Sequence, residues 1–248
     1  MKVNTDTNMQ RSYPDGAKAL DMFIRAMAYL AETRESGNRN RIYRTEHYIK
    51  ALAKALKTHP RFEKGLEGDH TIETLSKIAP LHDIGNVGIP DRILLKPGRL
   101  TTDEFDNIKS HTTIGRDIIV QAEHDMGLEL FMPNYVKEIV YSHHEKWDGS
   151  GYPQGLSGDE IPISARLVMV VDVYDALISR RVYKPAITHL QARKVIQECK
   201  GTHFDPDVVD AFDCCHDEFH RIANTYTDTE KDFRKRVDFL EKAIAVEP

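Results

Sequence analysis

Apolar residues recur three and four residues apart along nearly the whole chain, as they do on the buried face of an amphipathic helix. Leu20, Phe23 and Met27 follow this spacing near the N-terminus. The pattern predicts helices over residues 15–34, 40–56, 71–82, 101–125, 134–147, 164–180, 188–200, 206–222 and 229–245. No segment shows the alternation of apolar and polar residues that is typical of a strand, so the predicted fold class is all-α.

Three of these helices carry a start signal in the sequence. Capping boxes and an N-cap residue ahead of proline mark such starts, and here they are Thr101 with Glu104, Thr188 with Gln191, and Asp205 before Pro206. The segment from Gly85 to Gly98 is rich in glycine and proline and is predicted as a loop that a helix cannot span. The simplest division of the chain is a flexible N-terminus (1–13), one domain (14–222) and a C-terminal helical extension (223–248). The extension could dock on the core or pair with a second copy.

Charge and cysteine content narrow the function classes. The chain has 248 residues with 34 Lys and Arg against 39 Asp and Glu, a net charge of −5. This balance argues against a partner that is a nucleic-acid polymer. Three cysteines, Cys199, Cys214 and Cys215, are not a disulfide framework and favour a cytoplasmic location. Neither a secretory signal nor an apolar run long enough for a membrane helix is visible, so no membrane association is expected.

Six side chains that can bind metal ions lie along the chain, alone or in adjacent pairs, separated by segments long enough to form helices. They are His82, Asp83, His111, His143, His144 and Asp172. Imidazole and carboxylate donors together suit Fe, Mn, Ni or Zn, and a carboxylate can bridge two ions. A bridged pair of ions is a device for cutting phosphate esters.

Each of these residues also has an ordinary alternative. His82 and Asp83 would be a solvated pair at a helix end, and His111 a hydrogen-bonded core residue. Asp172 is harder to explain in this way, because it lies within the apolar run 168–173. A carboxylate buried there is costly unless a cation or strong donors receive it. This is the strongest single argument for a metal site.

A glycine-rich loop and a basic cluster follow the histidine pair. The loop holds Gly151, Tyr152 and Pro153, where glycine allows close backbone approach and the rings of Trp147 and Tyr152 could stack on a nucleobase. The basic residues Arg180, Arg181 and Lys184 could bind phosphate oxygens. The alternative is a surface turn beside a solvated basic patch.

Taken together, these residues resemble the HD-GYP family, the branch of HD-domain phosphohydrolases that linearises cyclic di-GMP. The resemblance covers roughly residues 25–215. Its motifs are His82-Asp83-Ile84-Gly85, the segments 87–91 and 93–98, His143-His144-Glu145 through Gly151-Tyr152-Pro153, the segment 172–177 and Phe204-Asp205-Pro206. It implies an all-helical HD core extended by further helices, a cytoplasmic location and bridging iron or manganese.

The resemblance also implies roles for individual residues. His82, Asp83 and Asp172 would hold a first ion. Asp83 would bridge to a second ion held by His111 and His143, with His144 toward a possible third position. Arg181 and Lys184 would hold substrate phosphate, and Gly151, Tyr152 and Pro153 would border the guanine or a partner protein. The candidate catalytic residues are Asp83, Asn86, Arg181 and Lys184.

The chain departs from the family pattern at three positions. The family has Glu-Thr-Gly-Asn-His before its second helix, and the gap-free register puts Gly37 at the Glu position and Arg41 at the His position. A shifted register, Glu35 to Arg39, keeps the Glu but still ends in Arg. Asn86 stands where the family has Lys. Because arginine is a permanent cation and not a metal donor, Arg41 would repel an ion or take its place by pairing with Asp83 or Asp172.

Two hypotheses follow. The first is a metal-dependent phosphodiesterase that cleaves cyclic di-GMP, or a related cyclic dinucleotide, to linear pGpG or GMP, at full or reduced rate, with one or two ions of Fe or Mn (or Ni or Zn). The second is a catalytically silent relative that binds the dinucleotide or a GGDEF-type cyclase as a signalling adaptor. A separate receiver protein and a second copy of the chain are further candidate partners.

Overall fold

The computed structural model describes residues 16–34, 39–127, 134–180, 185–234 and 237–238. The α-helices are α1 (Gly16–Thr33), α2 (Arg39–Leu56), α3 (Gly68–Ile78), α4 (Asp91–Leu94), α5 (Thr102–Met126), α6 (Tyr135–Ser142), α7 (Ile163–Ile178), α8 (His189–Glu198) and α9 (Pro206–Thr225). Short 3-10 helices are η1 (Ala79–Leu81), η2 (Ile84–Gly88) and η3 (Gly158–Glu160). The described residues form no sheet, only isolated bridges, so the predicted all-α class is confirmed.

The predicted helix starts are present in the structure. Thr101 and Thr188 each accept a hydrogen bond from the backbone of the third helical residue and complete capping boxes at α5 and α8. Asp205 caps α9 ahead of Pro206. Local hydrogen bonding by these side chains satisfies backbone donors that a helix start leaves without a helical partner.

Three predicted boundaries are wrong. The helix predicted over 71–82 ends as an α-helix at Ile78 and continues as η1, because Pro80 has no N–H to continue the hydrogen-bond pattern. The helix predicted over 134–147 ends at Ser142. The segment 85–98 is not a continuous loop, since most of η2 and all of α4 lie in it.

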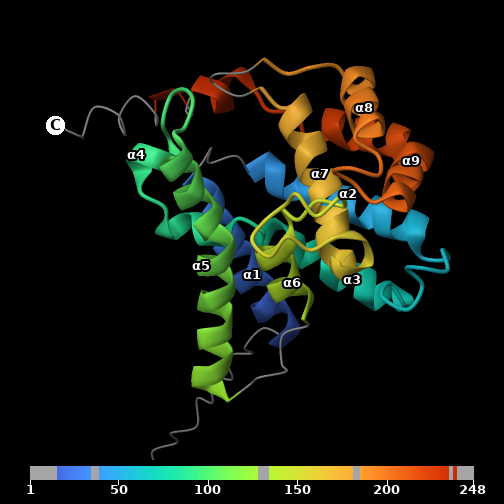
Figure 1. The fold of residues 1–248 in the computed structure, drawn as a ribbon, viewed down its shortest axis with the longest axis horizontal. Helices are drawn as coiled ribbons and strands as arrows, with labels where there is room; N and C mark the ends of the chain where they lie inside the picture. The colour runs from blue at the N-terminus through green and yellow to red at the C-terminus, as the bar shows by residue number, and fades with distance from the viewer. Residues whose placement is uncertain (1–15, 35–38, 128–133, 181–184, 235–236, 239–248) are drawn as a thin grey trace, which may run out of the picture.

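Helix α2 lies at the centre of the molecule and packs against α3, α7 and α9. Its fully buried residues Tyr48, Ile49 and Leu52 join the core, as do Val168 and Val170 of α7. Figure 1 shows α4 and α5 on one side of this centre and α8 and α9 on the other. Helices α2 and α7 therefore bury the faces that carry the apolar spacing. Helix α1 does so only in part, because its apolar residues Leu20, Phe23 and Met27 are 41%, 62% and 42% exposed.

Helix α5 packs directly against the turn that carries His82 and Asp83. The contact is backbone to backbone, because a Cβ placed on Gly85 would lie 1.9 Å from the carbonyl oxygen of His111 and 2.7 Å from the nitrogen of Gly115. Only glycine at position 85 allows this approach. The close packing brings His111 next to Asp83.

The C-terminal part of the chain is described only in part. Helix α9 continues to Thr225, three residues past the predicted end, and residues 230–234 and 237–238 are helical. Arg180 at the end of α7 pairs with Glu230 (3.2 Å) and lies over the ring of Phe233. The predicted flexible N-terminus (1–13) lies outside the described residues, and the division into domains stays a prediction. No helix within the described ranges is long and apolar enough to cross a membrane.

Candidate metal centre

All six predicted ligands come together from four segments of the chain. His82 and Asp83 follow η1, His111 lies on α5, His143 and His144 follow α6, and Asp172 lies on α7. Contacts between them are short: His82 Nε2 lies 3.0 Å from Asp83 Oδ2 and 3.7 Å from Asp172 Oδ1. Residues 90 positions apart in sequence thus meet at one point, as the sequence predicted.

One side of this cluster consists of histidines. The Nδ1–H groups of His111 and His143 donate to the carbonyl oxygens of Ile108 (2.7 Å) and Ile139 (2.8 Å). Their Nε2 atoms lie 3.3 Å apart, and 3.6 and 3.7 Å from Asp83 Oδ1. A backbone acceptor on Nδ1 is the usual arrangement behind a metal-binding histidine.

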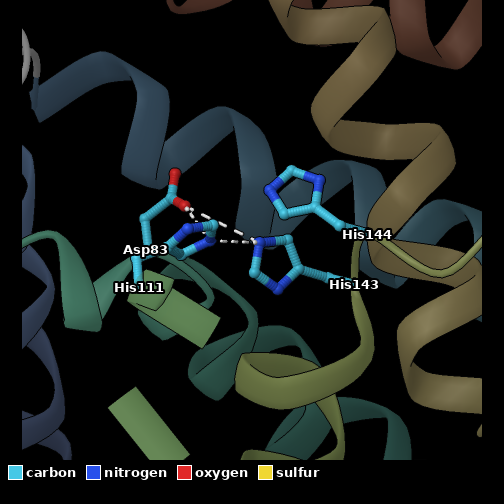
Figure 2. A group of neighbouring side chains, drawn as sticks. All are labelled: Asp83, His111, His143 and His144. Atoms are coloured by element: carbon cyan, nitrogen blue, oxygen red, sulfur yellow. Dashed lines mark hydrogen bonds and ion pairs between the residues drawn. The ribbon is translucent and has the colours of Figure 1, made fainter. Parts of the chain in front are cut away.

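His144 completes this group. One ligand atom each from Asp83, His111, His143 and His144 lies within 4.8 Å of the others, and Figure 2 shows the four side chains converging. Both of the adjacent histidines face the centre. Since α6 ends at Ser142, the chain turns at His143, and the two rings lie 4.1 Å apart. This set of donors defines the candidate metal centre.

The protonation of these histidines fits a divalent cation. Burial lowers the pKa of His111, and burial together with the neighbouring His143 lowers the pKa of His144 well below its usual value. Both rings are therefore neutral near pH 7 and offer a lone pair. Neutral imidazole nitrogens beside a carboxylate oxygen make a set of donors that a divalent cation would satisfy.

The opposite side of Asp83 is different, because a guanidinium lies there. Arg41 Nη2 donates to Asp172 Oδ1 (2.9 Å) and to Asp83 Oδ2 (3.1 Å), and it lies 3.2 Å from His82 Nε2. These atoms belong to the three residues, His82, Asp83 and Asp172, to which the family resemblance assigned a first ion. The prediction that Arg41 pairs with Asp83 or Asp172 is confirmed, and it pairs with both.

Charge and burial act in opposite directions on the pKa values on this side. Burial favours the neutral carboxyl, but His82 and Arg41 outweigh it, and the pKa values of Asp83 and Asp172 lie well below their usual range. Burial likewise opposes a charged His82, but Asp83 and Asp172 raise its pKa well above the usual value. A guanidinium has no lone pair to offer a metal, so this set does not fit a second ion.

Sequence reasoning missed Glu32. Its side chain, 7% exposed on α1, accepts from Arg41 Nη1 at 3.2 Å. Glu32 is buried on α1 next to Ala28 and Ala31, and the sequence gives no signal for its partner, which lies on another helix. Glu32 therefore holds the other end of the guanidinium.

Glu145 was also missed as a functional position. Its buried carboxylate accepts the backbone N–H groups of Gln154 (2.7 Å) and Leu156 (3.1 Å) and so holds the glycine-rich loop. Gly151 comes against the chain here, since a Cβ on it would lie 2.3 Å from the nitrogen of Lys146. Tyr152 then stacks on His144, with ring centroids 4.8 Å apart. The loop therefore borders the metal centre through Tyr152 and His144.

Other predicted positions have different outcomes. Gly37, Arg181 and Lys184 lie outside the described residues. Asn86 is buried within η2, next to the His82–Asp83 turn. Arg180 contacts the C-terminal segment, as described above.

Comparisons with known proteins identify the family of this chain. The family model of the HD domain matches residues 67–208, and the chain belongs to the HD-domain family. The resemblance to its HD-GYP branch is confirmed by curated relatives. A probable cyclic di-GMP phosphodiesterase of Vibrio cholerae is 47% identical over 91% of this chain and 51% of its own length.

Two further relatives carry a similar description. A cyclic di-GMP phosphodiesterase of Vibrio cholerae is 48% identical over 84% of this chain and 42% of its own length. One of Thermotoga maritima is 51% identical over 54% of this chain and 35% of its own length. The chain thus spans about a third to a half of these relatives.

The fold also has a solved counterpart. A crystal structure of a cyclic GMP-AMP specific phosphodiesterase of V. cholerae aligns with a TM-score of 0.50 at 17% identity. The match covers 92% of this chain and 54% of that chain. It supports the HD fold.

Proposed function

We propose that this chain is a metal-dependent phosphodiesterase that hydrolyses cyclic di-GMP, or a closely related cyclic dinucleotide, to a linear product. The observation that carries the proposal is the convergence of Asp83, His111, His143 and His144 around one point. The names of the relatives at 47–51% identity supply the substrate class. They favour an enzyme over the silent dinucleotide-binding adaptor.

The residues of the site have different roles according to their positions. His111, His143, His144 and Asp83 hold a divalent ion, with iron or manganese as the first choice and nickel or zinc as alternatives. When bound, such an ion polarises a phosphate oxygen and lowers the pKa of water. The carbonyl groups behind His111 and His143 keep Nδ1 protonated and direct Nε2 into the centre.

The glycine-rich loop forms one border of the substrate site in this proposal. Gly151, Tyr152 and Pro153 border a guanine base, and Glu145 holds their backbone in place. From the sequence alone, Arg181 and Lys184 bind the phosphates, and Asn86 is a polar neighbour of the scissile group. The cytoplasmic location, a GGDEF-type or receiver partner and a homodimer stay predictions, and the free cysteines agree with the first of them.

The test is turnover by the protein purified without oxygen and loaded with Mn(II) or Fe(II). We expect linear product from cyclic di-GMP, and loss of that product in His111→Ala. The matched control is His124→Ala, on the same helix, with a side chain that is 75% exposed and lies outside the centre. Tight dinucleotide binding without any product from the loaded parent would overturn the proposal and favour the adaptor.

A further inference from the structure

Arg41 lies at the point where acidic side chains from three helical regions meet. It pairs with Glu32 of α1, with Asp83 after η1 and with Asp172 of α7. The side chains of Arg41, Asp83 and Asp172 are 13%, 16% and 21% exposed, so water screens these charges only in part. A cluster of half-buried carboxylates needs a cation close by, because desolvation of unpaired charges is expensive.

The guanidinium lies where a metal ion would lie, between the ligand atoms, and not beside them. A single nitrogen, Nη2, lies between Asp172 Oδ1, Asp83 Oδ2 and His82 Nε2 at 2.9 to 3.2 Å. Metal–ligand distances to carboxylate oxygen and imidazole nitrogen are about 2.0–2.2 Å. An ion placed between these three atoms would overlap that nitrogen.

Asp83 joins the two halves of the site. Its Oδ2 faces Arg41 and its Oδ1 faces His111 and His143. The carboxylate thus has the orientation of a bridging ligand, with a guanidinium on one side and the metal donors on the other. The positive charge on one side is fixed at every pH at which the protein is folded, because arginine does not lose its proton.

We propose that Arg41 permanently replaces one ion of a two-metal centre, so that this chain binds a single divalent ion, at Asp83, His111, His143 and His144. This rests on the proposed function, whose metal centre it refines. Arg41 is a positioning residue. It fixes Asp83 and neutralises Asp172 and Glu32. In a two-ion centre, the second ion would have this role.

The experiment counts ions and asks whether they are magnetically coupled. The chelator-treated parent, Arg41→His and Arg41→Gln are titrated with Mn(II) without oxygen, with metal content and electron paramagnetic resonance as readouts. We expect the parent to saturate at one ion, with the spectrum of an isolated Mn(II). Arg41→His supplies an imidazole and should bind a second ion, with the spectrum of a coupled pair. Arg41→Gln, which removes the cation without adding an imidazole, should bind a second ion more weakly than Arg41→His does.

The control is Arg39→His, two residues earlier on α2, where the arginine lies over the ring of Tyr29 instead. It should behave as the parent. Two coupled ions in the parent would overturn the replacement by Arg41 and leave the proposed function standing. A single ion in both folded Arg41 variants would also overturn it, and if Arg41→His does not fold, Arg41→Gln decides alone. No ion in the parent would overturn the metal centre and the proposed function together.

Discussion

The two faces of Asp83 solve the same electrostatic problem in different ways. On the Oδ1 face, the Nε2 atoms of His111 and His143 lie near the carboxylate. The Nδ1–H group of each ring donates to a backbone carbonyl. On the Oδ2 face, Arg41 presents N–H donors to acids. The first face offers donors for a divalent cation. The second already contains its cation. We expect the side chains around this carboxylate, and not the carboxylate itself, to decide whether a metal binds.

The largest expected effect is on stability at the Oδ2 face. Arg41→Ala leaves Asp83, Asp172 and Glu32 without their cation, and removing one partner of a buried ion pair costs about 3–5 kcal/mol. Urea unfolding of the metal-free protein measures it. Arg39→Ala, which removes a cation–π contact at an exposed position, should cost less than about 1 kcal/mol. Equal losses in the two variants would mean that the Arg41 cluster adds no special stability.

The next effect concerns the Oδ1 face. His143→Ala removes a donor from the metal centre, and the affinity for Mn(II) should fall on the order of 100-fold or more, since changes behind the ligands alone cost about 10–100-fold. Competition with a metal-sensitive chelator measures this affinity. His70→Ala, at an exposed position of α3, is the control. An unchanged affinity in His143→Ala would remove this residue from the metal centre.

A smaller effect on stability is expected in the glycine-rich loop that Glu145 holds. Glu145→Ala leaves the buried N–H groups of Gln154 and Leu156 without their acceptor, which costs about 1–3 kcal/mol. Glu145→Gln keeps one carbonyl acceptor and should lose less. Thermal unfolding orders the three proteins, and an Ala variant as stable as the parent would show that the loop does not depend on this carboxylate.

The smallest effect is expected at the ring that stacks on His144. Tyr152→Ala removes this stack, which is worth about 0.5–1.5 kcal/mol, so Mn(II) affinity should fall by less than about 10-fold. Tyr152→Phe keeps the ring and should match the parent. If Phe weakened metal binding as much as Ala, the hydroxyl rather than the stack would support His144.

Much of the fold could be predicted because it depends on local rules. Helical spacing located the main helices, and the side chains of Thr101, Thr188 and Asp205 set three of the starts where the sequence placed them. Helix ends were harder. The end of α6 at Ser142 carries no glycine or proline signal and follows from how the turn packs.

The residues of the site likewise fall into those that the sequence could predict and those that it could not. Asp172 was predictable, since a carboxylate in an apolar helix needs a partner wherever it lies. Arg41 was predictable from its departure from the family pattern. Glu32 and Glu145 were not, because their partners are set by packing: Arg41 reaches Glu32 from another helix, and Glu145 accepts backbone groups from a loop. Spacing along the chain does not reveal contacts of this kind.

The central claim is that Asp83 has a metal on one face and a guanidinium on the other. Anomalous diffraction at the manganese edge, from crystals of the parent grown with excess Mn(II), tests it most directly. We expect one anomalous peak, among Asp83, His111, His143 and His144, with Arg41 still against Asp172. A second peak between Asp83 and Asp172, with Arg41 displaced, would contradict it.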